Sequence, residues 1–451
     1  MAQLITQESA GHKHVVQFVE NAVVGSRTVN TVADLRALSA APTDLSWETL
    51  GYWAAGDGGH AKYRWNSAST ATDNGSTVLK ITAVTTGRFE LQPGILEVRA
   101  CGVVGDGSTI NTTALQTVAD ASKPFMFSSY GPWVSGQVTV DSQINIDGHG
   151  ATVNISGSHA TDYQFLKFIA SFTGVTIRDL VINGDGVDAS SHYGFGPSSS
   201  AVVLTDVHIE NVKVQNVIVG LDLSAVDNAT VVGGKIGPVI GTTSGRGYGI
   251  AGGTNSKNIH VLGTHFYRCS RHSLYFGATI GASAVGCTFQ EHGYGATPTQ
   301  LSALILARGK GQSATANNFI DCVHNPIDIS DDNTVAGQSE TTTLSANTFS
   351  GCKRPIIIGD SSATVSADAG TSYISVTGNT WNMPIAADGD CIKVYQAQRL
   401  LIATNVFNFK ADTSNQNAIT IDDVAANYPS EVLISGNVAY INTTGSVKCL
   451  V

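Results

Sequence analysis

Charged residues are unusually scarce in this chain. Asp, Glu, Lys and Arg make up 13% of its 451 residues, against about 25% in an average soluble protein. Helical bundles and coiled coils depend on Glu, Lys and Arg, so the composition argues against both. It also argues against disorder, because hydrophobic residues account for 42% of the chain. The net charge of −10 makes nucleic acid an unsuitable partner.

Other features are missing as well. The chain has no run of about 18 apolar residues, so we expect no membrane insertion. Its start, MAQLITQE, has neither the basic region nor the apolar segment of a secretory signal. No pair of its seven cysteines has CxxC spacing, and no Cys/His set has zinc spacing. We therefore expect neither a metal nor a cofactor.

Changes in composition and residue pattern divide the sequence into three parts. Residues 1–45 are expected to be an N-terminal anchor or linker segment, with one short helix capped by Thr31. Residues 46–95 carry three tryptophans and several turn glycines without a helical period, which predicts a small β domain. From residue 96 to 451, short apolar runs and turn residues dominate, with 48 glycines in the whole chain.

The third part contains a repeat. Apolar residues that end short strands recur at spacings of 32, 22, 30, 23, 30, 30, 32, 26 and 32 positions. We call this set the apolar column; its members are Ile182, Val214, Ile236, Phe266, Phe289, Phe319, Phe349, Trp381, Phe407 and Ala439. Two positions before the last five stand asparagines: Asn317, Asn347, Asn379, Asn405 and Asn437. Three positions after some members stand cysteines: Cys269, Cys322 and Cys352.

These steps predict an all-β fold, a right-handed parallel β-helix with three-strand coils. They accommodate three short strands and three turns, whereas propeller blades need about 40 to 45 residues. Coils stacked about 4.8 Å apart let the asparagine amides bond to one another from coil to coil. The cysteines are expected to fill the interior as small apolar side chains.

Two stretches resemble phage tailspikes, which belong to the pectate-lyase-like β-helix superfamily. The turn at 102–107, GVVGDG, precedes a helical pattern at 111–121 and is similar to the superfamily's entry segment, in which a short helix caps the first coil. The stretch GYWAAGDGG at 51–59, followed by YRW at 63–65, is similar to the small domain that precedes the β-helix in tailspikes.

The resemblance implies a homotrimeric receptor-binding spike of the virion tail. Such a spike binds and cleaves a bacterial surface polysaccharide (capsule, exopolysaccharide or O-antigen). It implies that residues 96–451 form the catalytic and receptor-binding β-helix, and that the N-terminus attaches to a phage tail or baseplate protein. Phage proteins leave the cell by lysis, so action outside the host needs no signal peptide.

Ionisable side chains concentrate between residues 265 and 335, which is notable in a chain with few charges. Alternation along the second strand of the coils turns one row outward, and that row includes Asp222, Tyr275, Asp328 and Lys393. Asp222 and Asp328 are several coils apart, which argues against a lyase that uses a metal held by stacked carboxylates.

Hydrolysis of a glycosidic bond is the favoured chemistry. One protonated carboxyl donates to the leaving oxygen, and an ionised one activates water or attacks carbon. Glu291 and Asp328 are the predicted pair, with Asp331 as a substitute.

The alternative chemistry is β-elimination. A cation neutralises a uronic carboxylate while a base removes the C5 proton. The residues suited to it are Arg271, His272, Tyr275 and Arg308.

Aromatic residues near glycines are expected to bind substrate together with Arg308. Tyr193, Tyr248 and Tyr294 suit the CH faces of sugars, although packing against a neighbouring subunit explains them equally well. A non-catalytic, adhesive spike is the remaining alternative to a depolymerase.

Overall fold

The computed structural model describes residues 27–92, 94–128, 131–157, 163–188, 191–241, 245–253, 255–293, 302–329, 340–359, 372–383, 390–395, 397, 399–410, 417–422 and 431–442. The chain divides into two compact units, Met1–Gln92 and Pro93–Val451.

The first unit is a small sheet with one helix. Its strands, in spatial order, are β1 (Arg27–Val29), β2 (Ser46–Thr49), β3 (Ala61–Asn66), β5 (Arg88–Leu91) and β4 (Val78–Leu79). Helix α1 (Val32–Arg36) starts after Thr31, whose side chain accepts from the backbone N–H of Asp34 while the Asp34 carboxylate accepts from that of Thr31. Because β1 pairs with β2, part of the segment expected to be an anchor contributes to this sheet.

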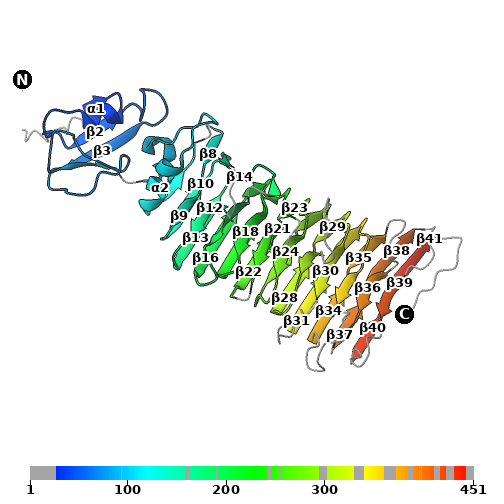
Figure 1. Ribbon diagram of the computed structural model, residues 1–451. Helices are drawn as coiled ribbons and strands as arrows, with labels where there is room; N and C mark the ends of the chain where they lie inside the picture. The colour runs from blue at the N-terminus through cyan, green and yellow to red at the C-terminus, as the bar shows by residue number, and fades with distance from the viewer. Residues whose placement is uncertain are drawn as a thin grey trace, which may run out of the picture. The chain divides into compact units, whose positions relative to one another are not determined.

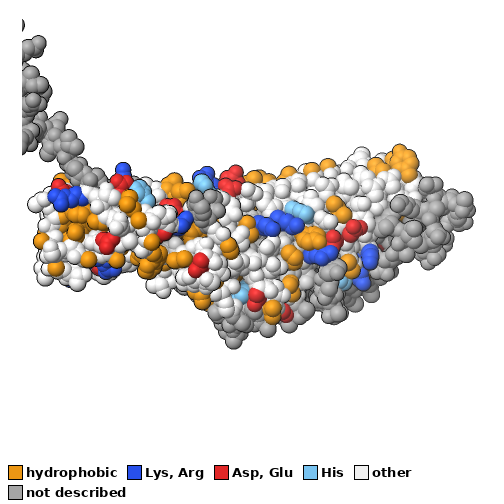
Figure 2. Space-filling view, turned by 90° about the horizontal axis from the view of Figure 1, so that it is seen from above, with side chains coloured by type: hydrophobic (Ala, Val, Ile, Leu, Met, Phe, Trp, Pro, Cys, Tyr) orange, Lys and Arg blue, Asp and Glu red, His pale blue; other side chains and the backbone are white. Residues whose placement is uncertain are grey.

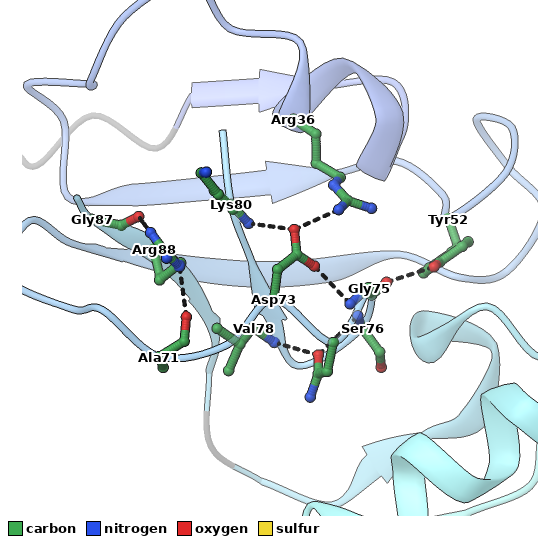
Figure 3. A network of polar contacts seen from close by, with 11 residues as sticks. Arg36, Tyr52, Ala71, Asp73, Gly75, Ser76, Val78, Lys80, Gly87 and Arg88 are labelled. Atoms are coloured by element: carbon green, nitrogen blue, oxygen red, sulfur yellow. Dashed lines mark hydrogen bonds and ion pairs between the residues drawn. The ribbon is translucent and has the colours of Figure 1, made fainter. Parts of the chain in front are cut away.

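A polar network holds the loop between β3 and β4 (Figure 3). The Asp73 carboxylate accepts from the backbone N–H of Gly75 at 2.8 Å and of Lys80 at 3.0 Å, and it pairs with Arg36. The Tyr52 hydroxyl donates to the Gly75 carbonyl at 2.5 Å. Loop and helix are thereby fixed to each other inside the unit.

The second unit is a solenoid, entered through the 3-10 helix η1 (Val98–Cys101) and helix α2 (Thr112–Asp120). Leu115, Val118 and Ala119 are the buried residues of α2, as the apolar face of this segment predicts.

Three parallel sheets form the solenoid, and each complete coil contributes one strand to each sheet (Figure 1). The thirteen-stranded sheet contains β6 (Leu96–Glu97), β7 (Phe125–Met126), β10 (Ile144–Asp147), β13 (Phe172–Arg178), β16 (Leu204–Glu210), β19 (Val226–Val232), β22 (Lys257–Leu262), β25 (Ser283–Val285), β28 (Lys310–Thr315), β31 (Glu340–Ser345), β34 (Ser372–Thr377), β37 (Leu400–Ala403) and β40 (Val432–Ser435).

The twelve-stranded sheet contains β8 (Trp133–Ser135), β11 (Thr152–Ile155), β14 (Val181–Asn183), β17 (Lys213–Gln215), β20 (Lys235–Ile236), β23 (His265–Tyr267), β26 (Thr288–Gln290), β29 (Asn318–Ile320), β32 (Thr348–Ser350), β35 (Thr380–Met383), β38 (Val406–Lys410) and β41 (Val438–Asn442).

The eleven-stranded sheet contains β9 (Val138–Val140), β12 (Tyr163–Phe168), β15 (His192–Pro197), β18 (Val219–Leu223), β21 (Tyr248–Gly252), β24 (His272–Phe276), β27 (Ser302–Ile305), β30 (Asn325–Ile329), β33 (Ile356–Ile358), β36 (Asp390–Val394) and β39 (Asn417–Ile421). The predicted right-handed parallel β-helix is confirmed.

The apolar column predicted from the sequence is a continuous stack inside the solenoid. Its members pair in succession from Ile182 to Ala439. Between Phe266 and Phe407, successive ring centroids are 4.9, 4.6, 4.9, 4.7 and 4.8 Å apart, with interplanar angles of 22° or less. The stack follows the spacing of the strands, so each ring covers the next.

The asparagine column forms the predicted ladder. Each Nδ2 from Asn317 onward donates to the Oδ1 of the next asparagine, at 2.9, 2.9, 3.0 and 3.0 Å, up to Asn437. The same Oδ1 atoms also accept from backbone N–H groups of the preceding coil. Buried amide groups are thus satisfied from coil to coil.

The six cysteines in the described part of the chain are buried, free thiols, as predicted for interior side chains. Cys449 lies outside the described residues. Burial raises the pKa of Cys269 to about 12 and that of Cys287 to about 11.

We therefore expect these six thiols to resist modification in the native protein, because a buried, protonated thiol is a poor nucleophile. Titration with a thiol reagent, before and after denaturation in guanidinium, measures this. The six sites should react only after denaturation, and rapid labelling of Cys269, Cys322 or Cys352 in native protein would contradict the packing described above.

Candidate functional site

The outward row predicted on the eleven-stranded sheet is present. Strand pairing places Asp222, Ala251, Tyr275, Ile305, Asp328, Ile357 and Lys393 next to one another in that order. Tyr275 and Asp328 are partly exposed between buried neighbours, whereas Ile305 between them is 8% exposed. Tyr275 and Asp328 are thus two coils apart, as predicted.

A second row runs beside it along the starts of the same strands. Tyr193, Val219, Tyr248 and His272 pair in succession, and Ser302 pairs with Asn325 in later coils. Tyr193 is only 8% exposed and packs with Val219, so it offers little surface to a sugar. Tyr248 is partly exposed.

Neighbouring members of the two rows, together with Arg271 and Arg308, form a cluster of polar and aromatic side chains. We call it the Tyr275 cluster; it consists of Tyr248, Arg271, His272, Tyr275, Ser302, Arg308 and Asp328. Ring centroids of Tyr248, His272 and Tyr275 are 5.1 to 5.6 Å apart. The Arg271 guanidinium carbon is 5.7 Å from the centroid of the Tyr248 ring, a cation–π distance.

Hydrogen bonds connect the cluster across adjacent coils. Arg308 Nη2 donates to the Tyr275 hydroxyl at 3.4 Å. Ser302 Oγ donates to Asp328 Oδ2 at 3.2 Å. His272 Nδ1 lies 3.0 Å from the Ser302 carbonyl oxygen and 3.4 Å from the Ser302 backbone nitrogen. Ser302 therefore joins the imidazole to the carboxylate.

His272 is neutral at pH 7. Burial lowers its pKa to about 4, and the nearby charge of Arg271 acts in the same direction. Burial also raises the pKa of Tyr248, so its phenol stays protonated. The cluster therefore combines a neutral imidazole and two tyrosine rings with two guanidinium groups and one carboxylate.

Two further histidines lie near His272. His292 is fully buried with Nδ1 3.4 Å from Ser273 Oγ, and burial lowers its pKa well below the usual value, with His272 and His324 contributing. Burial lowers the pKa of His324 as well. All three imidazoles are thus harder to protonate in the folded chain than in the unfolded one.

Stability should consequently fall in mild acid. An unfolded histidine takes up a proton below about pH 6.5, whereas these three resist protonation in the folded chain. The free energy of unfolding is therefore highest above that pH and decreases as the pH falls toward the pKa of about 4 of folded His272. For His272 alone the loss at pH 5 is about 2 kcal/mol. Unfolding in urea between pH 5 and 7.5 measures it. His292→Gln should make the free energy of unfolding depend less on pH. His208→Gln, in which a half-exposed histidine is replaced, is the control and should leave the pH dependence unchanged. An equal free energy of unfolding across this pH range would contradict the prediction.

Glu291, one of the two predicted acid/base residues, lies elsewhere. It occupies a corner of the coil in the left-handed region, with φ 52°, as does Arg268 at φ 51° in the coil before. Its carboxylate pairs with Arg268 Nε at 2.7 Å and forms no hydrogen bond or ion pair with the described residues of the Tyr275 cluster. Asp331 and Tyr294 lie outside the described residues.

The structure thus brings together Arg271, His272, Tyr275, Arg308, Asp328 and Tyr248, and it adds Ser302. Sequence reasoning missed Ser302. The signal for it was the spacing: His272, Ser302 and Asn325 each stand three positions before a member of the outward row.

Figure 2 shows one face of the molecule, on which basic, acidic, histidine and hydrophobic side chains are spread among uncharged polar side chains and backbone. In the described part of the chain no group of His, Cys, Asp and Glu is arranged to hold a metal ion. Its helices include none long and apolar enough to span a membrane.

Comparisons with known proteins support the fold. No protein-family model and no curated protein matches the sequence. Among solved structures, the enzymatically active domain of tailspike protein 2 from bacteriophage CBA120 matches with a TM-score of 0.59 and 12% identity, over 91% of this chain and 61% of that one. The tailspike of Acinetobacter phage vB_ApiP_P1 matches with a TM-score of 0.55 and 12% identity, over 94% of this chain and 72% of that one.

The gp42 tailspike of Acinetobacter phage vb_AbaP_AS12 has a TM-score of 0.54 and 12% identity, over 92% of this chain and 75% of that one. The chain spans about three fifths of the length of the CBA120 domain. It is a parallel β-helix protein that shares its fold with phage tailspikes, and the resemblance stated from the sequence is confirmed at the level of the fold.

Proposed function

We propose that this chain is a phage tailspike that binds and depolymerises a bacterial surface polysaccharide at the Tyr275 cluster. The observation that carries the proposal is the convergence of a phenol, a carboxylate and two guanidinium groups from three successive coils, next to a buried, neutral imidazole. Groups of this kind donate, accept and stabilise charge during glycosidic bond cleavage.

The described geometry favours β-elimination over hydrolysis. Hydrolysis by a carboxyl pair needs two carboxylates, and Asp328 is the one carboxylate of the cluster among the residues that the structure describes, which do not include Asp331. Elimination needs a base beside a cation, and Arg308 Nη2 lies 3.4 Å from the Tyr275 hydroxyl.

In this mechanism the base is the ionised form of Tyr275, whose oxygen takes the proton from C5 of the sugar that bears the carboxylate. The electron pair of the C5–H bond forms the C4=C5 double bond, and the C4–O bond breaks. The leaving oxygen recovers a proton from the protonated phenol or from water. The products are one unsaturated and one ordinary sugar end.

Purified protein mixed with a panel of bacterial capsular polysaccharides and lipopolysaccharides tests the function. Depolymerisation lowers viscosity and creates new chain ends, and elimination adds an ultraviolet-absorbing product that hydrolysis does not form. Binding without any fall in viscosity supports the adhesive alternative. In the proposal the active form is a homotrimer in the virion tail, joined through its N-terminus to a tail or baseplate protein, and it acts on the surface of the host cell.

A further inference from the structure

We propose that Lys213 and Lys235 form a second binding site, separate from the Tyr275 cluster, for a phosphate group carried by a glycan of the bacterial surface. The two lysines lie on the twelve-stranded sheet, whereas the Tyr275 cluster lies on the eleven-stranded sheet. The site binds and takes no part in bond cleavage. Phosphate binding is therefore independent of the proposed function, and only the choice of a bacterial glycan as the carrier rests on it.

Three basic side chains stand in register on adjacent coils of the twelve-stranded sheet. Strand pairing places Lys213 of β17 beside Lys235 of β20, and Lys235 beside His265 of β23. All three side chains are partly exposed, on the outward face of their strands. Neighbouring strands are about 4.8 Å apart, and like charges directly opposite each other destabilise a sheet. An anion bound between the two ammonium groups relieves this repulsion.

The positive charge of the two lysines is not matched within the described part of the chain. Other cations on the solenoid pair with carboxylates: Arg178 with Asp147, Arg246 with Asp188, and Lys393 with Asp422. Lys213 and Lys235 form no ion pair with any described residue. The Lys235 ammonium lies 4.3 Å from the centroid of the Tyr267 ring, which attracts it without using all three of its N–H donors. Two unmatched cations side by side are unusual in a chain with a net charge of −10.

The chemistry of these groups favours phosphate over a carboxylate. A lysine ammonium binds as a compact point charge and lacks the fork with which a guanidinium matches both oxygens of a carboxylate. A phosphate monoester carries more negative charge and three acceptor oxygens, so one phosphate accepts from both ammonium groups at the spacing of neighbouring coils. Burial and the nearby Lys235 lower the pKa of His265, so this imidazole is uncharged at pH 7. The two lysines therefore supply the charge of the site.

Uncharged polar side chains beside the lysines suit a sugar. Gln215 lies two residues after Lys213 on the same outward face, and its Nε2 donates to Asn183 Oδ1 at 3.0 Å. Asn183 Nδ2 donates in turn to Asn154 Oδ1 at 2.8 Å, so three amides from adjacent coils form an outward ladder. Each amide has two N–H donors and two lone pairs, more than these bonds use, and sugar hydroxyls match the remainder. The surface therefore fits a phosphate group with a sugar attached.

Inorganic phosphate tests the site on the full-length protein. Isothermal titration calorimetry at neutral pH and low ionic strength should show phosphate binding, and acetate should bind at least about tenfold more weakly. Lys235→Gln should weaken phosphate binding at least about tenfold. Lys257→Gln is the matched control, because Lys257 of β22 stands beside Asp227 on the thirteen-stranded sheet; its affinity should stay within about twofold of the parent's. No phosphate binding, or the same affinity in both variants, overturns the inference.

Lipopolysaccharide tests the glycan that carries the phosphate. Each lipopolysaccharide of the panel is immobilised as isolated and after its phosphates are removed with aqueous hydrogen fluoride. The parent protein should bind a phosphorylated form at least about tenfold more tightly than its dephosphorylated form, and Lys235→Gln should bind the two forms alike. Equal binding of the two forms by the parent, or no binding of either, overturns a glycan as the carrier. Failure to cleave any polymer overturns the proposed function and leaves this inference standing, because neither measurement depends on cleavage.

Discussion

Tyr275→Phe is expected to lower kcat/KM for polysaccharide cleavage by about a hundredfold or more. The substitution keeps the ring that packs against Tyr248 and His272 and removes only the hydroxyl to which Arg308 donates. Because folding should be unaffected, the loss reports on proton transfer. The rate of viscosity decrease and the rate of new chain ends measure it.

Tyr267→Phe is the matched control, since Tyr267 belongs to the same coil but packs against Lys235 and Arg268 outside the cluster. It should cleave at the parental rate. Asp328→Asn and Glu291→Gln separate the two chemistries. If these two abolish cleavage while Tyr275→Phe does not, elimination is wrong and hydrolysis by the pair predicted from the sequence replaces it. If none of the three matters, the site lies outside the Tyr275 cluster.

Phe319→Ala should destabilise the protein by about 3–5 kcal/mol. Phe319 is fully buried between Phe289 and Phe349, with ring centroids 4.6 and 4.9 Å away and nearly parallel planes. Removing the ring leaves a cavity that the strands on either side prevent from collapsing, because their backbone pairing fixes the coil spacing. Unfolding in guanidinium, or the unfolding rate at a fixed temperature if refolding fails, measures the loss.

Phe319→Leu keeps most of the volume and should lose less than about 1.5 kcal/mol. The difference in free energy of unfolding between Phe319→Ala and Phe319→Leu therefore separates the loss of buried volume from the loss of ring stacking. A cost below about 1 kcal/mol for Phe319→Ala would contradict the continuous interior stack.

The coil order could be predicted because side chains of one kind occupy equivalent interior positions. Stacking of Phe289, Phe319 and Phe349 requires that their strands pair in register. The spacing of these residues in the sequence therefore predicts which strand residues pair. The coil of β21 was harder to recognise. Its outward residue is Ala251, between Asp222 and Tyr275, and alanine gives no polar signal on an exposed face.

The site was predictable where strand alternation holds, and less so at the corners. Tyr275 and Asp328 follow the alternation along their strands. Glu291 does not, because a residue with positive φ interrupts the alternation and turns the chain. The neighbouring His292 occupies the position that Cys269, Cys322 and Cys352 take in other coils, which explains why it is fully buried.

Each coil pairs only with the coil before it and the coil after it. The stability of the solenoid is therefore approximately a sum over coils and over the interfaces between neighbouring coils. Opening a coil at an end breaks one interface, whereas opening one in the middle breaks two. The strands that carry the Tyr275 cluster, from β21 to β30, have coils stacked on both sides. Fraying that begins at either end must therefore pass through several intact interfaces before it reaches Tyr275, so local unfolding and proteolysis at the ends leave the geometry of the cluster unchanged.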